Sequence, residues 1–530
     1  GAIVLTSLPI ALYTVLQHVG ADPLRWTADP QGRSFSTLGN PDFLAAYLVM
    51  VIPLTGFELL AAWQQRRPPD GEGSHEVRLW TYAAALGLQL LALVWSGGRG
   101  AVLGLAAAGI VALVVLARSG WPRWCRWLIG WLALVGPLVL AVINMPGGPL
   151  AFVRDAPVID RFSHSLDGSD GSSEVRLLLW QGAAQLWAPH DPLTYADGHA
   201  DQLNFLRPLI GYGPETSVVT FDRFTSPDFA HFERPLKTWD RAHNDTLDTL
   251  LTTGGLGLAA YMALIVALIL VALRRLDGRS ESRRLCHAER NQAVPGARIP
   301  RCTRTDKGII SRNVVICALI GSALGGGLAV ALGGLAFIGL GLPLGLLAGI
   351  CVYLLARRAT LPIDTFERRL TLALLAAILA HYVEIQFGFD ITPTSVYFWI
   401  LAGALVALPR IRPEAAACGW NGSEFRNALR LAAPGAFIAG LISIVLAYDF
   451  ITIPGGASGA LDGLSTSLTT LYGGDHAQSY GVLALLVAVW GAGAVLWTHE
   501  RRATSLALIM PVLIWLSFVT SHLLRLKLPP

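Results

Sequence analysis

Long apolar stretches, each about the length of one membrane crossing, recur along the chain and alternate with polar segments. A helix needs about 20 mostly apolar residues to cross a hydrocarbon core about 30 Å thick. The pattern therefore predicts an all-α polytopic membrane protein with about 13 transmembrane helices. The predicted spans are 3–19, 43–62, 79–95, 101–117, 127–145, 254–273, 313–333, 336–356, 370–387, 391–408, 431–448, 479–497 and 503–524.

Two features refine this prediction. The stretch 313–356 carries no charge and is long enough for two spans, and Gly333 and Gly334 are the natural hinge between them. The spans 101–117 and 391–408 are short, so a re-entrant or interfacial helix is the alternative for each.

Composition supports a membrane protein. Hydrophobic residues make up 53% of the 530-residue chain and charged residues 14%, whereas an ordinary globular domain has about 25% charged residues. This excludes a soluble enzyme, a disordered protein and a nucleic-acid-binding domain. Six cysteines without close pairing also exclude a disulfide scaffold.

The distribution of charge predicts the orientation, because short cytoplasmic loops are enriched in Lys and Arg. With Gly1 inside, nearly every inside loop is basic, and the 274–312 loop holds eleven basic residues against four acidic ones. We interpret that loop as a contact with anionic membrane lipids rather than nucleic acid. The predicted organisation is N-terminal membrane helices (1–145), an extracytoplasmic loop (146–253), one membrane helix (254–273), a basic cytoplasmic loop (274–312) and C-terminal membrane helices (313–530).

The 146–253 loop is rich in aromatic residues, which predicts that it is folded. Helical spacing of its apolar residues predicts an amphipathic helix over 174–187, lying on the membrane face with Arg176 on or near its polar edge. Aromatic side chains available for a core are Trp180, Trp187, Tyr195, Tyr212, Phe221, Phe224 and Trp239.

Three turns are candidates for chemistry, each with a plainer alternative. His243, at the end of the loop, is a candidate general base because an imidazole is neutral near pH 7; the alternative is a helix start capped by Asn244 or Asp245. Arg99, between glycines at membrane depth, offers a planar fork for a phosphate; the alternative is snorkelling to lipid headgroups. The Asn40-Pro41-Asp42 turn opens a span, which is also its plain interpretation.

Other chemistries remain open. Glu215, Asp222, Asp240 and Asp245 offer candidates for a hydrolytic carboxylate pair. A metal set drawn from His231, Glu233, His243 and Asp245 is the less common outcome for scattered polar residues. A membrane transporter is the alternative from another class, with His381 and Glu384 on one helix face as a proton relay.

In this order, these turns resemble the motifs of the O-antigen ligase and O-antigen polymerase superfamily of membrane glycosyltransferases. The resemblance covers about residues 36–273. Its pieces are Gly39-Asn40-Pro41-Asp42, Ser96-Gly97-Gly98-Arg99-Gly100, Arg176 with Trp180, Gly211-Tyr212-Gly213-Pro214, and Ala242-His243-Asn244 followed by Gly254-Gly255-Leu256-Gly257. Asp42 replaces the family's second Asn. Few spans precede Gly39, and a missing upstream end is one explanation.

The resemblance implies a metal-independent enzyme without a cofactor that uses a polyprenyl-diphosphate-linked glycan as donor. It implies that Arg99 and Arg176 bind the diphosphate and that His243 activates the acceptor hydroxyl, with Arg154, Arg161, Arg207 and Arg241 competing for the role of Arg176. Supporting residues would be Arg241, Asn244, Asp245, Asn40, Gly211 and Gly213.

We therefore expect an O-antigen ligase-like, inverting glycosyltransferase in the cytoplasmic (inner) membrane, with its active site on the outer face. Its acceptor would be a lipid, a glycan or a protein. A polysaccharide polymerase of the same superfamily is the alternative.

Overall fold

The computed structural model describes residues 2–64 (except 23 and 25), 74–117, 171–194, 198–233, 239–277, 309–356, 363 and 365–408. These residues all belong to one unit, Gly1–Ile411. The predicted spans 127–145, 431–448, 479–497 and 503–524 lie outside the described residues, as does most of the basic 274–312 loop.

Helices dominate the described ranges, in which no strand forms and Thr194 and Ala200 make an isolated bridge. The helices are α1 (Ala2–His18), α2 (Pro41–Gln64), α3 (Ser74–Ser96), α4 (Arg99–Ala117), α7 (Gly171–Trp187), α8 (Arg207–Ile210), α9 (Ser217–Thr220), α10 (Asp245–Leu276), α12 (Ile309–Gly333), α13 (Ile338–Ala356), α14 (Phe366–Glu384) and α15 (Thr392–Ala407). Short 3-10 turns include η7 (Leu335–Phe337) and η8 (Ile385–Phe387).

Within these ranges seven helices are long and apolar enough to cross a membrane: α2, α3, α4, α10, α12, α13 with η7, and α14 with η8. They coincide with seven predicted spans, and 101–117 is among them. The predicted spans 3–19 and 391–408 are present as the shorter apolar helices α1 and α15. An all-helical, multi-span membrane protein is thereby confirmed, whereas the total of 13 spans stays a prediction.

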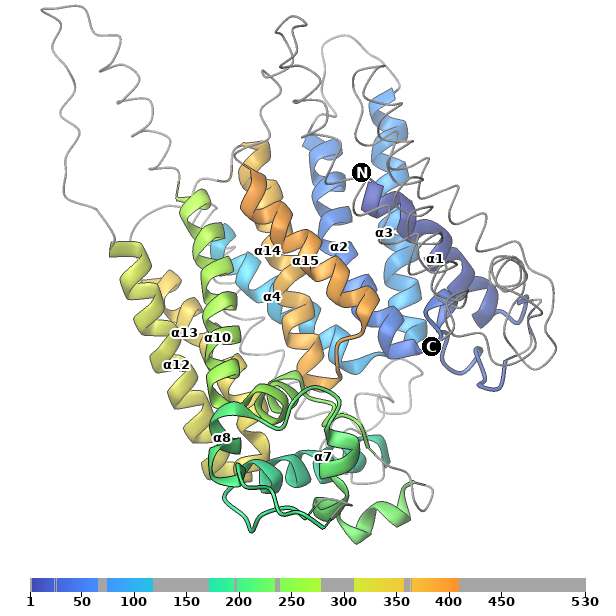
Figure 1. Ribbon diagram of the computed structural model, residues 1–530. Helices are drawn as coiled ribbons and strands as arrows, with labels where there is room; N and C mark the ends of the chain where they lie inside the picture. The colour runs from blue at the N-terminus through green and yellow to red at the C-terminus, as the bar shows by residue number, and fades with distance from the viewer. Residues whose placement is uncertain are drawn as a thin grey trace, which may run out of the picture. The chain divides into compact units, whose positions relative to one another are not determined.

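The central helix is α14, which packs against α2, α4, α10 and α15 (Figure 1). Beside α10, α12 and α13 pack closely because glycines face each other: a Cβ on Gly345 would lie 2.3 Å from the Gly321 carbonyl oxygen. The chain turns between these two helices at Gly334, whose φ of +81° suits glycine. The predicted hinge is confirmed.

The loop segment that precedes α10 has its own hydrophobic cluster. The predicted helix over 174–187 is confirmed as α7, and Leu179 and Leu186 are fully buried on its inner face. Trp180, Phe221, Phe229 and Trp239 pack in the same cluster, which also includes Leu247 and Leu251 of α10. The loop is thus packed onto the start of α10 (Figure 1).

Candidate functional site

His243 lies directly before α10 in a strained backbone conformation. Its φ of +54° places it in the left-handed region, which non-glycine residues seldom adopt. Its two neighbours hold it there: the Ala242 N–H donates to Asp248 Oδ1 (2.6 Å), and Asn244 caps α10. Strained residues of this kind concentrate at functional sites when the surrounding structure fixes them.

The His243 ring is held in one orientation and one tautomer. It lies edge-on to the rings of Phe389 and Trp239, with centroids 4.9 and 5.7 Å away. Its Nδ1 is 3.2 Å from the Arg241 carbonyl oxygen. Because a carbonyl only accepts hydrogen bonds, Nδ1 carries the proton in the neutral ring and Nε2 keeps a free lone pair.

The electrostatic surroundings keep this ring neutral. Burial is the largest effect and lowers the pKa of His243 below its ordinary value, and the nearby Arg176 guanidinium lowers it further. The hydrogen bond to Arg241 and the carboxylates of Asp240 and Asp42 act in the opposite direction without reversing the shift. A neutral imidazole with a free Nε2 can accept a proton.

Asn244 is the N-cap of α10, as the plainer interpretation of this turn predicts. Its Oδ1 accepts from the Leu247 N–H (2.9 Å), and its Nδ2 donates to the Gln386 carbonyl oxygen of η8 (2.8 Å). The side chain is fully buried, and a Cβ on Gly339 would lie 2.4 Å from its Oδ1. Asn244 therefore joins α10 to η8 beside the histidine. Asp245 follows as the first residue of α10.

A shared carboxylate joins two arginines close to His243. Arg176 of α7 has its Nη2 3.9 Å from Asp42 Oδ2, and Arg33 has its Nη2 2.6 Å from Asp42 Oδ1. Arg33 also donates from Nε to the carbonyl oxygen of Ser96 (3.1 Å), in the turn that precedes α4. Three segments far apart in the sequence thus meet here.

Arg99, the first residue of α4, is half-buried. The glycines on either side of it admit neighbouring helices. A Cβ on Gly98 would lie 2.5 Å from Ala45 Cβ of α2, and one on Gly100 would lie 2.9 Å from Phe387 Cβ of η8. The turn is therefore fixed between α2 and the end of α14.

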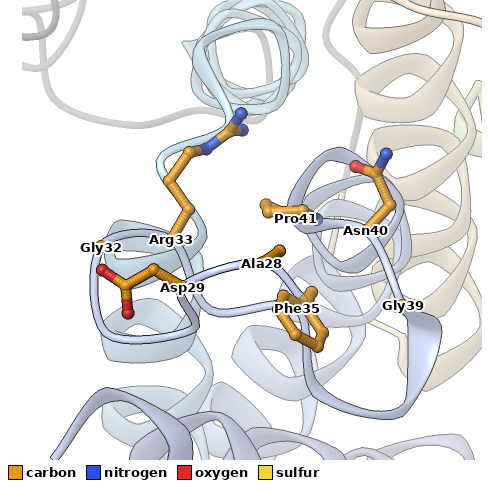
Figure 2. Close-up of a pocket in the computed structure, with 8 residues that line it drawn as sticks. All are labelled: Ala28, Asp29, Gly32, Arg33, Phe35, Gly39, Asn40 and Pro41. Carbon is orange, nitrogen blue, oxygen red and sulfur yellow. The ribbon is translucent and has the colours of Figure 1, made fainter. Parts of the chain in front are cut away.

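Asn40 caps α2, which confirms the plain interpretation of the Asn-Pro-Asp turn as a helix start. Its Oδ1 accepts from the Asp42 N–H (2.8 Å). The turn also lines a cavity of about 470 Å³ together with Arg33, Phe35 and Asp29 (Figure 2). Figure 2 shows the Arg33 side chain extending away from that of Asp29.

Gly211 and Gly213 attach the loop to a kink in α10. At the kink Gly254 has a φ of +68°, and the Leu251 and Thr252 carbonyls before it accept from the N–H groups of Tyr212 (2.7 Å) and Gly213 (3.0 Å). Gly211 has a φ of +73°, and a Cβ there would lie 2.4 Å from the Thr252 backbone. Gly211 thus allows close backbone packing, and Gly213 contributes a hydrogen bond to the kink.

Two arginines that compete with Arg176 have other ion-pair partners. Arg207 binds both carboxylate oxygens of Asp201 (2.7 and 3.0 Å), and Arg241 binds Glu215 Oε1 (2.6 Å). Arg154 and Arg161 lie outside the described residues. Of the described candidates, Arg176 is the one whose charge acts on His243.

His381 is buried near the end of α14. Its Nδ1 lies 3.3 Å from Glu384 Oε2, and its Nε2 lies 3.3 Å from Asp390 Oδ1. Asp390 also accepts from the hydroxyls of Thr394 and Ser395. This group anchors the turn that carries Phe389, the residue against the His243 ring.

Sequence reasoning did not identify Arg33, Asp248 or Phe389 as part of this site. The available signal for Arg33 was a basic residue in a segment expected outside, and for Asp248 it was a carboxylate one helical turn after the cap. Phe389 carries no comparable signal.

Helices of membrane-spanning length and a packed loop carrying a neutral histidine beside arginines define a multi-pass membrane protein with a candidate anion-binding and base site. A family model described as O-antigen ligase matches residues 84–194, which include Arg99 and Arg176. This confirms the resemblance to the O-antigen ligase superfamily of polysaccharide-synthesising membrane glycosyltransferases. No curated protein and no solved structure matches the chain.

Proposed function

We propose that this protein transfers a glycan from a polyprenyl diphosphate to an acceptor hydroxyl at the outer face of the cytoplasmic membrane, as an O-antigen ligase-like enzyme. The observation that carries the proposal is the neutral His243 ring with its free Nε2 next to Arg176. The O-antigen ligase match supports the class. A polymerase uses the same donor chemistry and differs in its acceptor.

In the proposed reaction His243 Nε2 takes the proton of the acceptor hydroxyl as the oxygen attacks the anomeric carbon. The new glycosidic bond forms while the bond from that carbon to the diphosphate oxygen breaks. The lipid diphosphate leaves with the bonding electron pair. Attack on the face opposite the leaving group inverts the anomeric centre.

Arg99 and Arg176 stabilise the charge that develops on the leaving diphosphate. Fixed guanidiniums do this best when they are positioned before the reaction. Arg99 is held by the glycine contacts around its turn, and Arg176 by α7 and Asp42. Arg99 at the start of a membrane-spanning helix and Arg176 in the loop helix suit a substrate with its tail in lipid and its sugars in water.

The test is donor turnover by purified protein with a polyprenyl-diphosphate glycan, with and without a chelator. His243→Ala should lower release of the lipid diphosphate by roughly 10²–10⁴-fold, the usual contribution of a general base. His231→Ala, an exposed histidine in the same loop, is the matched control and should behave as wild type. Wild-type turnover by a correctly inserted His243→Ala variant would remove this residue as the base.

A transporter is the second candidate, favoured by buried His381 between Glu384 and Asp390. It predicts that substrate uptake into proteoliposomes depends on His381 and is insensitive to His243→Ala. The transferase predicts product formation that requires His243. Measuring both activities for both variants separates the two.

A further inference from the structure

Arg33 lies in the loop before α2, outside every motif that carries the family resemblance, and outside residues 84–194. The structure nevertheless attaches it to two of those motifs. Its Nε donates to Ser96 in the turn that carries Arg99, and its Nη2 pairs with Asp42 in the Asn-Pro-Asp turn. Because the Arg33 side chain contacts both turns, it can contact the same ligand as the residues of those turns.

The Asp42 carboxylate lies between two guanidiniums. One oxygen is 2.6 Å from Arg33 and the other is 3.9 Å from Arg176. Guanidiniums bind carboxylates and phosphates through the same planar fork of donors. An anionic oxygen group between two guanidiniums is therefore in the position that a phosphate oxygen would occupy.

The two arginines and Asp42 are accessible to a ligand. The side chains of Arg33 and Asp42 are 35% and 40% exposed, and that of Arg176 is 21% exposed. Arg33 also lines a cavity together with Asn40 and Pro41, the residues directly before Asp42 (Figure 2).

Building on the proposed function, we infer that Arg33 is a third donor-binding arginine, and that Asp42 holds the place of a donor phosphate in the free protein. When a diphosphate binds, its oxygens take the guanidinium contacts that Asp42 makes in the free protein. Asp42 thus competes with the donor, and in the free protein it orients the two arginines.

The two residues have opposite predicted effects on binding. Losing Arg33 removes a charge-assisted contact of roughly 1.5–3 kcal/mol, equivalent to about tenfold to a hundredfold in affinity. Losing the Asp42 charge while keeping its shape removes the competitor, so affinity should rise.

The experiment is equilibrium binding of farnesyl diphosphate, a short polyprenyl diphosphate, to the detergent-purified full chain by titration calorimetry. Arg33→Gln should raise Kd at least tenfold, and Asp42→Asn should lower it several-fold. Arg78→Gln removes an arginine of similar exposure that pairs with Glu58, and it should leave Kd unchanged. Tighter binding by Asp42→Asn is a result that misfolding cannot produce.

The outcomes separate this inference from the proposed function. If Arg176→Gln loses binding but Arg33→Gln keeps wild-type affinity, the role of Arg33 is wrong and the proposed donor site stands. Weaker binding by Asp42→Asn would overturn the role of Asp42 as a stand-in for phosphate. If wild-type protein binds no farnesyl diphosphate, the proposed donor and this inference both fail.

Discussion

Asn244 offers a quantitative test of how the histidine is held. Its side chain makes two separable contacts: the cap on the Leu247 N–H and the bond to the Gln386 carbonyl. Asn244→Ser keeps a good N-cap and loses the link to Gln386, whereas Asn244→Ala loses both. Comparing the two variants isolates the link between α10 and η8.

The expected magnitudes follow from the burial of the site. An unsatisfied buried acceptor costs about 1–3 kcal/mol, so Asn244→Ser should lower the local opening free energy by about that amount. The lost cap adds about 1 kcal/mol, which brings Asn244→Ala to about 2–4 kcal/mol. Amide exchange near the start of α10 should then be roughly 10-fold faster in Asn244→Ser and roughly 100-fold faster in Asn244→Ala, since each 1.4 kcal/mol is a factor of ten.

The assay is hydrogen–deuterium exchange with mass spectrometry on peptides covering residues 240–253, with peptides from α12 as the internal control. Amide exchange reports the free energy of local opening, which differs from one region of a structure to another. Wild-type exchange in Asn244→Ser would show that the link to Gln386 contributes nothing. Wild-type exchange in Asn244→Ala with transfer abolished would show that Asn244 acts in the chemistry rather than as a cap.

The remaining predictions concern charge, backbone conformation and the fork of one arginine. Because the pKa of His243 is lowered, kcat/KM should rise with pH, with a midpoint below about 6.5. Arg176→Gln should move this midpoint to higher pH, and Asp42→Asn should move it to lower pH. A midpoint that stays in place in both variants would exclude His243 as the titrating base. Gly211→Ala should destabilise the loop by about 1–3 kcal/mol, the cost of a non-glycine residue in the positive-φ, extended-ψ region that Gly211 occupies, seen as faster proteolysis; unchanged cleavage would contradict the tight contact with α10. Arg99→Lys should raise the KM for donor although charge is kept, and an unchanged KM would argue against a bidentate contact.

Much of the fold could be predicted because membrane spans are encoded locally. A run of apolar residues long enough to cross a bilayer has few stable alternatives to a helix, so α2, α4 and α13 begin and end near the expected residues. The prediction for α10 differs because the expected span began at Gly254, whereas the helix begins at Asp245 and kinks at Gly254. Polar residues in its first turns mask the helix from a hydropathy count.

The candidate site could be predicted only as far as its motifs extend. Asn40 and Asn244 were recognisable as possible caps because capping depends on neighbours in sequence. The contacts of Arg33 with Asp42 and of His243 with Phe389 depend on how helices pack. No local pattern encodes such contacts, so structure was needed to find them.

The placement of charge resolves an apparent conflict in the sequence. The loop 146–253 has more acidic than basic residues, which disfavours an anionic donor if the overall field governs binding. In the structure, three acidic groups of this region are paired with arginines: Glu215 with Arg241, Asp201 with Arg207, and Asp42 with Arg33 and Arg176. At a Debye length of about 8 Å in physiological salt, exposed charges farther away are largely screened. Local guanidiniums therefore matter more for binding at the proposed donor site than the net charge of the loop.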